Sequence, residues 1–139
     1  MLTRAHIERR IPHRGTMCLL DSVQHWDATN IVCQADAPGG DHPLANAHHV
    51  PSVAAIEYAA QAAAVHGSLR GDLDAPRVGM LAKVTEVELM AGGIDAAGGR
   101  LTIRAELLGE VASGCLYAFD VADERTAIAR GRLLVAFQS

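Results

Sequence analysis

The sequence predicts an α+β fold in which a strongly curved antiparallel β-sheet wraps around one long central helix. Two strand-like segments precede a single helical segment, and about four strand-like segments follow it. The connections between these segments are short, which favours antiparallel neighbours. The helical segment is apolar on nearly every face, so it has to be covered on nearly every side, as a curved sheet can do.

Length and composition indicate one globular domain, residues 1–139, with a single core. Half of the residues are hydrophobic and only 4% are aromatic, so alanine and aliphatic side chains have to fill that core. The formal net charge of −4 argues against a general nucleic-acid-binding protein, because such a protein needs a basic surface.

The N-terminal segment is charged and lacks the central apolar stretch that is typical of a signal peptide. The longest apolar stretch, 50–69, is interrupted by polar residues and is mostly alanine, which makes it a poor membrane span. Cys18, Cys33 and Cys115 are odd in number and far apart. We therefore expect reduced thiols and a cytoplasmic protein, with neither nucleic acid nor membrane as partner.

The N-terminal third contains a short helix and two strands in our interpretation. Thr3–Arg10 can form the helix, and Met17–Trp26 and Asn30–Ala35 are rich in apolar and β-branched residues typical of strands. Asp27–Thr29 supplies a turn between the two strands. Residues 38–49 are rich in Gly, Pro, Asp and His, which indicates a loop.

The long helix is predicted to run from Pro51 to about Leu69. Proline is favoured at a first helical position, and Gly71 is a plausible end. Because a single sheet cannot enclose the helix completely, we expect it to expose one end and one side. This exposure predicts a dimer.

The remaining strands follow from alternating apolar residues. The phase of alternation in 78–90 shifts between Val84 and Val87, which predicts a β-bulge near Thr85 and Glu86. Further strands are expected over 101–107, 115–121 and 126–137, with turns at 91–99 and 122–126.

Three short segments of the sequence resemble the signature motifs of a known family. Residues 11–23, IPHRGTMCLLDSV, resemble, without gaps, the opening L-P-H-R-x-x-F-L-L-x-D-x-V of the β-hydroxyacyl-acyl carrier protein dehydratases. Residues 56–62, IEYAAQA, resemble the I-E-x-x-A-Q helix of the same family, and Pro51 fits its proline at the helix start. Residues 82–84 resemble its third-strand motif. The resemblance implies the hotdog fold, and it is strongest to a dehydratase-like branch associated with aryl-polyene and related fatty-acid-type pathways.

The loop before the helix departs from the family pattern, which is approximately H-F-P-G-x-P-x-M-P-G. The segment from His42 to Pro51 is one position longer, the aromatic residue after the histidine is missing, and Ser52 replaces a glycine at the helix start. His42 is the best match to the catalytic histidine, whose neutral imidazole takes the α-proton of a 3-hydroxyacyl thioester. His49 is a competitor nearer the helix, and a third interpretation is that no loop histidine is catalytic.

Glu57 is the clearest catalytic candidate. A carboxyl group on an apolar helix is costly to bury unless it is paired or protonated, and a protonated carboxyl group can act as an acid. Gln61 lies one turn later on the same helix face and can orient it. Alternatively, Glu57 points outwards at the helix end or pairs with an arginine. The resemblance implies that histidine and glutamate come from opposite subunits.

Two further regions are candidate binding sites. Backbone N–H groups near Ser52 and Val53 can hold the thioester carbonyl, although Ser52 can instead be an ordinary helix cap. Arg9, Arg10 and Arg14 form a basic cluster that can dock an acidic carrier protein and its phosphopantetheine phosphate. The alternatives are a solvated face, or an ion pair of Arg14 with Asp21.

These observations predict dehydration of 3-hydroxyacyl-acyl carrier protein to the trans-2-enoyl thioester. We expect no metal or redox cofactor, since the spacing of Asp41, His42, His48 and His49 fits no standard metal site. Acyl carrier protein is the expected partner, within a homodimer or a heterodimer with a paralogous hotdog subunit. The alternatives are a hotdog thioesterase and a non-catalytic or half-catalytic subunit.

Overall fold

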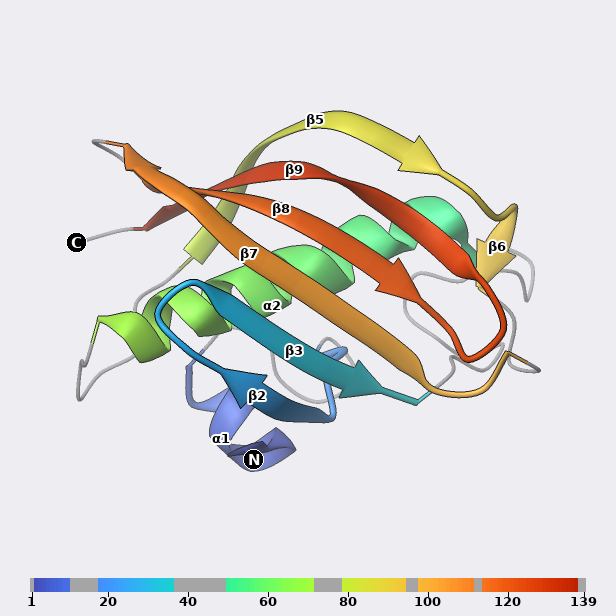
Figure 1. Ribbon diagram of the computed structural model, residues 1–139. Coiled ribbons are helices and arrows are strands. Elements are labelled where there is room, and N and C mark those ends of the chain that lie inside the picture. The colour runs from blue at the N-terminus through green and yellow to red at the C-terminus, as the bar shows by residue number, and fades with distance from the viewer. Residues whose placement is uncertain are drawn as a thin grey trace.

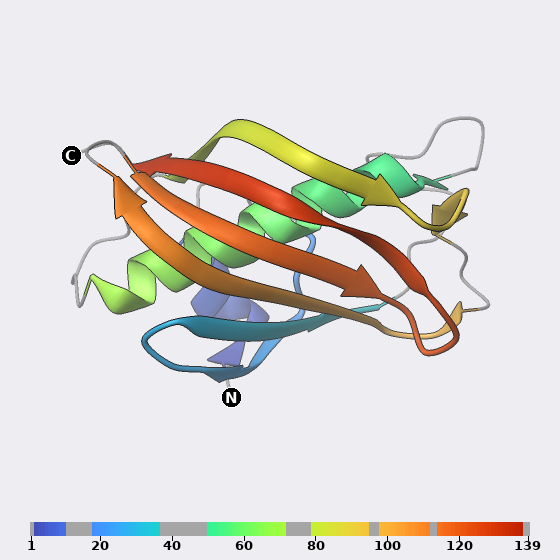
Figure 2. The same cartoon turned by 45° about the horizontal axis from the view of Figure 1, so that its top comes forward.

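A computed structural model of the chain describes residues 2–10, 18–36, 50–71, 79–94, 98–111 and 114–137. An antiparallel sheet of seven strands, in the order β1-β2-β3-β7-β8-β9-β5, curves around the helix α2 (Figures 1 and 2). The strands of this sheet are β1 (Leu2–Thr3), β2 (Ser22–Trp26), β3 (Asn30–Ala35), β5 (Gly79–Leu89), β7 (Leu101–Val111), β8 (Gly114–Ala122) and β9 (Ala127–Phe137). The predicted α+β architecture is confirmed.

The helix and the first predicted strand of the N-terminal region are shorter than the sequence predicts. The helix α1 covers only Arg4–Glu8 and is preceded by β1, which pairs with β2. The strand predicted from Met17 begins at Ser22 instead. The turn at Asp27 is confirmed, because its Oδ1 accepts hydrogen bonds from the backbone N–H groups of Thr29 at 2.9 Å and Asn30 at 2.8 Å. These bonds lower the pKa of Asp27 to about 2.

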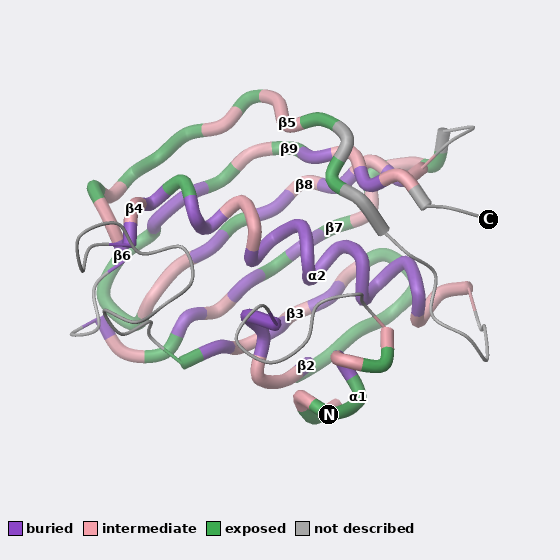
Figure 3. Tube along the Cα trace, turned by 180° about the vertical axis from the view of Figure 1, so that it is seen from behind, coloured by how far each residue is buried: buried purple, intermediate pink, exposed green. Residues whose placement is uncertain are grey.

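The central helix begins with one 3-10 turn, Ser52–Ala54, and continues as α2, Ala55–Arg70. Every residue from Tyr58 to Ser68 is buried, and the residues that are only partly buried lie towards the two ends of the helix (Figure 3). The expectation of an exposed side is therefore wrong: small alanine side chains let the sheet and the N-terminal segment approach closely around the middle of the helix. The exposed end is the one near Val53, whose exposed fraction is 51%.

The predicted bulge in the strand after the helix is confirmed. The pairing of β5 with β9 shifts between Thr85 and Glu88, and Glu86 has a left-handed φ of 54°. On the opposite strand, a Cβ added to Gly131 would lie 3.1 Å from the ring of Phe119 and 3.2 Å from Cα of Val87. Glycine at this position lets the bulged strand and the buried ring approach each other.

The last three strands form a meander, and the turn at 122–126 is confirmed between β8 and β9. The segment 91–99 is not only a turn. It contains β6 (Gly93–Ile94), which pairs with β4 (Val50–Pro51) immediately before the central helix. This small second sheet joins the 91–94 segment to the start of the helix.

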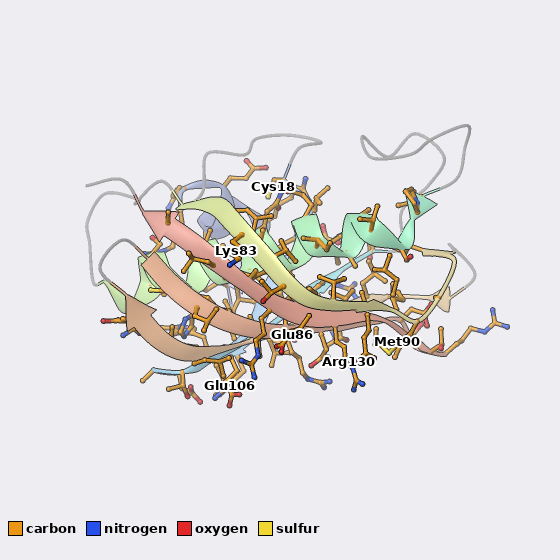
Figure 4. The ribbon with its side chains drawn as sticks, turned by 90° about the horizontal axis from the view of Figure 1, so that it is seen from above. Cys18, Lys83, Glu86, Met90, Glu106 and Arg130 are labelled. Carbon is orange, nitrogen blue, oxygen red and sulfur yellow. The ribbon has the colours of Figure 1, made fainter. Side chains whose placement is uncertain are left out.

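The two faces of the large sheet differ in chemistry. The face against α2 is apolar and builds the core, as the low aromatic content requires. Glu86, Glu106 and Arg130 project on the side away from α2 (Figure 4). Arg130 pairs with Glu88 at 2.9 Å across β9 and β5, as expected for the solvated face of an antiparallel sheet.

Candidate active site at the start of the central helix

Glu57 lies in the first turn of α2, and its side chain is half-buried rather than enclosed. This position places Glu57 shortly after the 3-10 turn Ser52–Ala54, whose first backbone N–H groups have no carbonyl partner earlier in the helix. The end of the helix that reaches the surface therefore carries the candidate acid.

Gln61 contacts Glu57 as its spacing predicts. Its Nε2 donates a hydrogen bond to Oε1 of Glu57 at 3.3 Å. Its Oε1 accepts a hydrogen bond from the backbone N–H of Leu19 at 2.9 Å. Because Gln61 is only 2% exposed, this amide is a buried bridge between Glu57 and the segment that follows residues 11–17.

The structure does not support Ser52 as a helix cap. Pro51 and Ala54 precede the 3-10 turn and α2, respectively, and neither start has a side-chain cap hydrogen bond. Ser52 is 5% exposed, while the neighbouring Val53 is largely exposed. Val53 is therefore accessible at this helix end, whereas the side chain of Ser52 is buried there.

His42 and His49 lie outside the described residues, as do Asp41, His48 and Arg14. Within the described ranges, no group of three or more His, Cys, Asp or Glu side chains is arranged to hold a metal ion. No helix in the same ranges is long and apolar enough to cross a membrane.

The N-terminal arginines have different roles in the structure. Arg9 is exposed, but Arg10 is half-buried, with Nη1 at 3.5 Å from the carbonyl oxygen of Ser68 and 3.4 Å from its Oγ. Arg10 therefore also anchors the N-terminal segment to the far end of α2. Arg4, which the sequence analysis did not single out, forms an ion pair with Asp21 at 3.0 Å.

His66 is a further polar residue of the central helix, and sequence reasoning missed its buried hydrogen bonds. It is 0% exposed; its Nδ1 is 2.7 Å from the Tyr117 hydroxyl and its Nε2 is 2.8 Å from the Asp27 carbonyl oxygen. A carbonyl only accepts, so Nε2 carries the hydrogen and Nδ1 accepts from Tyr117. A histidine within an otherwise apolar helix was the signal that could have revealed this contact.

The three cysteines are buried thiols that form no disulfide, in agreement with the prediction from their number and spacing. Burial raises the pKa of Cys33 to about 12. A thiol that stays protonated at neutral pH is a weak nucleophile. The described part of the candidate site therefore offers a carboxyl group, an amide and backbone N–H groups.

A curved sheet around a buried helix, with a Glu–Gln pair at the helix start, defines a protein of the hotdog class. The family model of ApeP-like proteins, described as ApeP dehydratase, matches residues 5–139. The chain belongs to this family of dehydratases. The sequence-based recognition of a dehydratase-like branch is thereby confirmed, and this match favours dehydration over the thioesterase alternative.

Solved structures agree with this assignment. The dehydratase heterocomplex ApeI:P from Xenorhabdus doucetiae has 25% identity and a TM-score of 0.79, over 96% of this chain and 91% of that chain. AziG from S. sahachiroi has 16% identity and a TM-score of 0.62, over 84% of this chain and 89% of that chain. A Staphylococcus aureus thioesterase mutant has 20% identity and a TM-score of 0.60, over 85% and 93%. The last two similarities show the hotdog fold alone. In a separate comparison with curated proteins, none matches the chain.

Proposed function

We propose that this dehydratase removes water from 3-hydroxyacyl groups carried on acyl carrier protein and forms the trans-2-enoyl thioester of a polyene or fatty-acid-like chain. Membership of the dehydratase family supports the reaction class. One observation carries the assignment of the site: the Glu57 carboxyl group accepts a hydrogen bond from Gln61 at the start of the helix, where the helix reaches the surface.

Each part of the site has one task in the proposed reaction. His42 removes the C2 proton, and charge develops on the thioester oxygen beside the N–H groups of Ser52 and Val53. Glu57 donates a proton to the 3-hydroxyl group, which leaves as water as the C2–C3 double bond forms. One acid and one base complete this elimination, so we propose that it needs no metal or redox cofactor beyond the carrier's phosphopantetheine.

We also propose that the active form contains a second hotdog subunit. β5 is the last strand of the sheet, so its outer edge is unpaired within the described chain. Three exposed apolar side chains, Leu81, Leu89 and Met90, lie on this strand or directly after it. An open strand edge with apolar side chains is a site for pairing with another chain. The structure from X. doucetiae is a heterocomplex, which supports a paralogous hotdog subunit as the partner.

We propose that Arg9, Arg10 and Arg14 dock the carrier protein. Arg9 is exposed and near the half-buried Arg10 in sequence, so this end of the protein presents positive charge. Carrier proteins are acidic, and arginine suits recognition of a phosphate group. Charge reversal at Arg9 should raise KM for the carrier-bound substrate more than it lowers kcat.

The reaction is tested by intact-mass measurement of a 3-hydroxyacyl carrier protein after incubation with the purified dehydratase. Loss of one water without release of free thiol is the expected result. Release of thiol would instead favour the thioesterase. His42→Ala and His49→Ala variants measured in parallel identify the base: we expect His42→Ala to be inactive and His49→Ala to keep its activity.

The subunit arrangement is tested by comparing the chain alone with the chain co-expressed with a paralogous hotdog subunit. Activity of a homodimer would exclude the half-catalytic alternative. Activity in the mixed complex alone would assign part of the catalytic machinery to the paralogue.

A further inference from the structure

The guanidinium group of Arg4, on α1, holds the short segment Cys18–Asp21. Its Nη1 donates hydrogen bonds to Oδ1 of Asp21 at 3.0 Å and to the carbonyl oxygen of Leu20 at 3.4 Å. Its Nη2 donates to the carbonyl oxygen of Cys18. One planar group thus fixes a side chain and two backbone carbonyls of the segment, which is a geometry that arginine provides and lysine does not.

The Cys18 carbonyl and the Leu19 N–H belong to the same peptide group. In a planar trans peptide these two groups point in opposite directions. Arg4 therefore holds the oxygen end of this peptide, while the N–H end donates to Oε1 of Gln61 at 2.9 Å. A charged donor at the carbonyl also strengthens the N–H as a donor, because hydrogen bonds in a chain polarise one another. Cys18 and Leu19 are buried, at 1% and 8% exposure, which limits competition from water.

This contact determines the orientation of the Gln61 amide. Since Oε1 accepts from Leu19, Nε2 faces Glu57 and donates to its Oε1 at 3.3 Å. An oxygen that accepts this bond is the poorer place for the carboxyl proton. For the acid proposed above, this geometry favours Oε2 of Glu57 as the oxygen that donates the proton.

We propose that Arg4 is a positioning residue for Glu57, acting through the Cys18–Leu19 peptide and Gln61. The inference rests on the proposed role of Glu57 as the acid, but it adds a residue of another helix to the catalytic apparatus. Arg4 touches neither substrate nor reacting atoms in this account. It orients the amide that selects the proton-bearing oxygen.

The test compares kcat and KM for dehydration, measured on the dehydratase together with any hotdog partner required for activity. Arg4→Ala should lower kcat by about 10- to 100-fold, as expected for a displaced catalytic group, with little change in KM. Arg4→Lys keeps the charge but not the fork of donors, so we expect it to recover kcat only in part. It also provides a folded variant if Arg4→Ala is unstable.

Two comparisons separate positioning from a general structural role. Glu8→Gln is the matched control, because Glu8 contacts Nε of Arg4 at 3.4 Å and not the two nitrogens that hold the Cys18–Asp21 segment, and it should leave kcat unchanged. If Arg4 acts through Gln61, the double variant Arg4→Ala/Gln61→Ala should be no slower than Gln61→Ala alone. Independent, multiplying effects would overturn the inference.

Glu57→Gln serves as the reference for the proposed function. If Glu57→Gln is inactive while Arg4→Ala or Arg4→Lys has the kcat of the wild type, the positioning role is wrong and the proposed acid stands. If Glu57→Gln keeps full activity, the proposed acid is wrong, and the inference for Arg4 fails with it.

Discussion

The two ends of the central helix place polar side chains in opposite situations. Glu57, in the first turn, is half-buried and reaches the surface. His66, about 13 Å further along at the rise of an α-helix, is completely buried. Both ring nitrogens of His66 are engaged, one by the Tyr117 hydroxyl and the other by the Asp27 carbonyl.

This difference distinguishes a structural polar group from a candidate catalytic one. A buried group with every hydrogen-bonding atom satisfied has no capacity for a substrate, and it fixes the packing of the elements that it joins. His66 joins α2 to the β2–β3 turn and to β8. Glu57 is held by a neighbour on its own helix, at a surface where a substrate can approach. Residue type alone does not separate the two roles, but burial and partners do.

The largest expected effect on stability comes from removal of the His66 side chain. His66→Ala leaves a cavity and deprives both the Tyr117 hydroxyl and the Asp27 carbonyl of a partner. We expect a loss of about 2–4 kcal/mol in the free energy of unfolding, measured by urea denaturation. His25→Ala is the control, since that side chain is 65% exposed, and it should change the stability little. Equal losses in the two variants would contradict the structural role of His66.

A smaller loss is expected from Tyr117→Phe. The ring and its edge-on contact with His66, at 5.5 Å between centroids, are retained. Only the hydroxyl that donates to Nδ1 is removed, so the cost should be about 1–2 kcal/mol, that of one buried unsatisfied acceptor. Thermal denaturation of Tyr117→Phe beside His66→Ala measures the order. If Tyr117→Phe were the more damaging variant, the hydrogen bond would not be the main contribution of His66.

Protonation of His66 at low pH is the mildest of the three perturbations of its buried contact, and it is read from the pH dependence of stability. Burial lowers the pKa of His66 from its ordinary value. The hydrogen bond to the Asp27 carbonyl acts in the opposite direction, and the nearby positive charge of Arg70 lowers the pKa further. The unfolded chain therefore binds this proton at a higher pH than the folded chain does. This contribution to stability is complete above the ordinary histidine pKa of about 6.5 and declines as the pH falls below it.

For a single group the slope is at most about 1.4 kcal/mol per pH unit. Urea denaturation at a series of pH values should show this decline in the wild type and a weaker decline in His66→Gln. Identical slopes in the two proteins would show that another group controls the acid sensitivity.

The alternation of apolar residues predicted the long strands and the bulge well. These features are determined locally, because one face of each strand has to meet the core. The short strands β1, β4 and β6 were not predicted. Each contains only two residues and forms only because a distant segment offers a pairing edge, as Ile94 does for Val50.

The candidate site was predictable where its contacts are local. Gln61 lies one helical turn from Glu57, and spacing alone brings the two together. The Leu19 N–H reaches Gln61 across 42 positions of the chain, and the Arg4 guanidinium reaches the Cys18 carbonyl across 14. No periodic pattern encodes such contacts, since they depend on how α1 and the segment before β2 pack against the helix.

The most direct test measures two quantities on two variants: the rate of water loss from a 3-hydroxyacyl carrier protein and the midpoint of thermal unfolding, for Glu57→Gln and His66→Gln. We predict that Glu57→Gln reduces the rate by about 100-fold or more, as for loss of a general acid, with little change in the unfolding midpoint. His66→Gln should lower the midpoint, and its folded fraction should keep the wild-type rate. A Glu57→Gln variant that dehydrates at the wild-type rate would contradict the account.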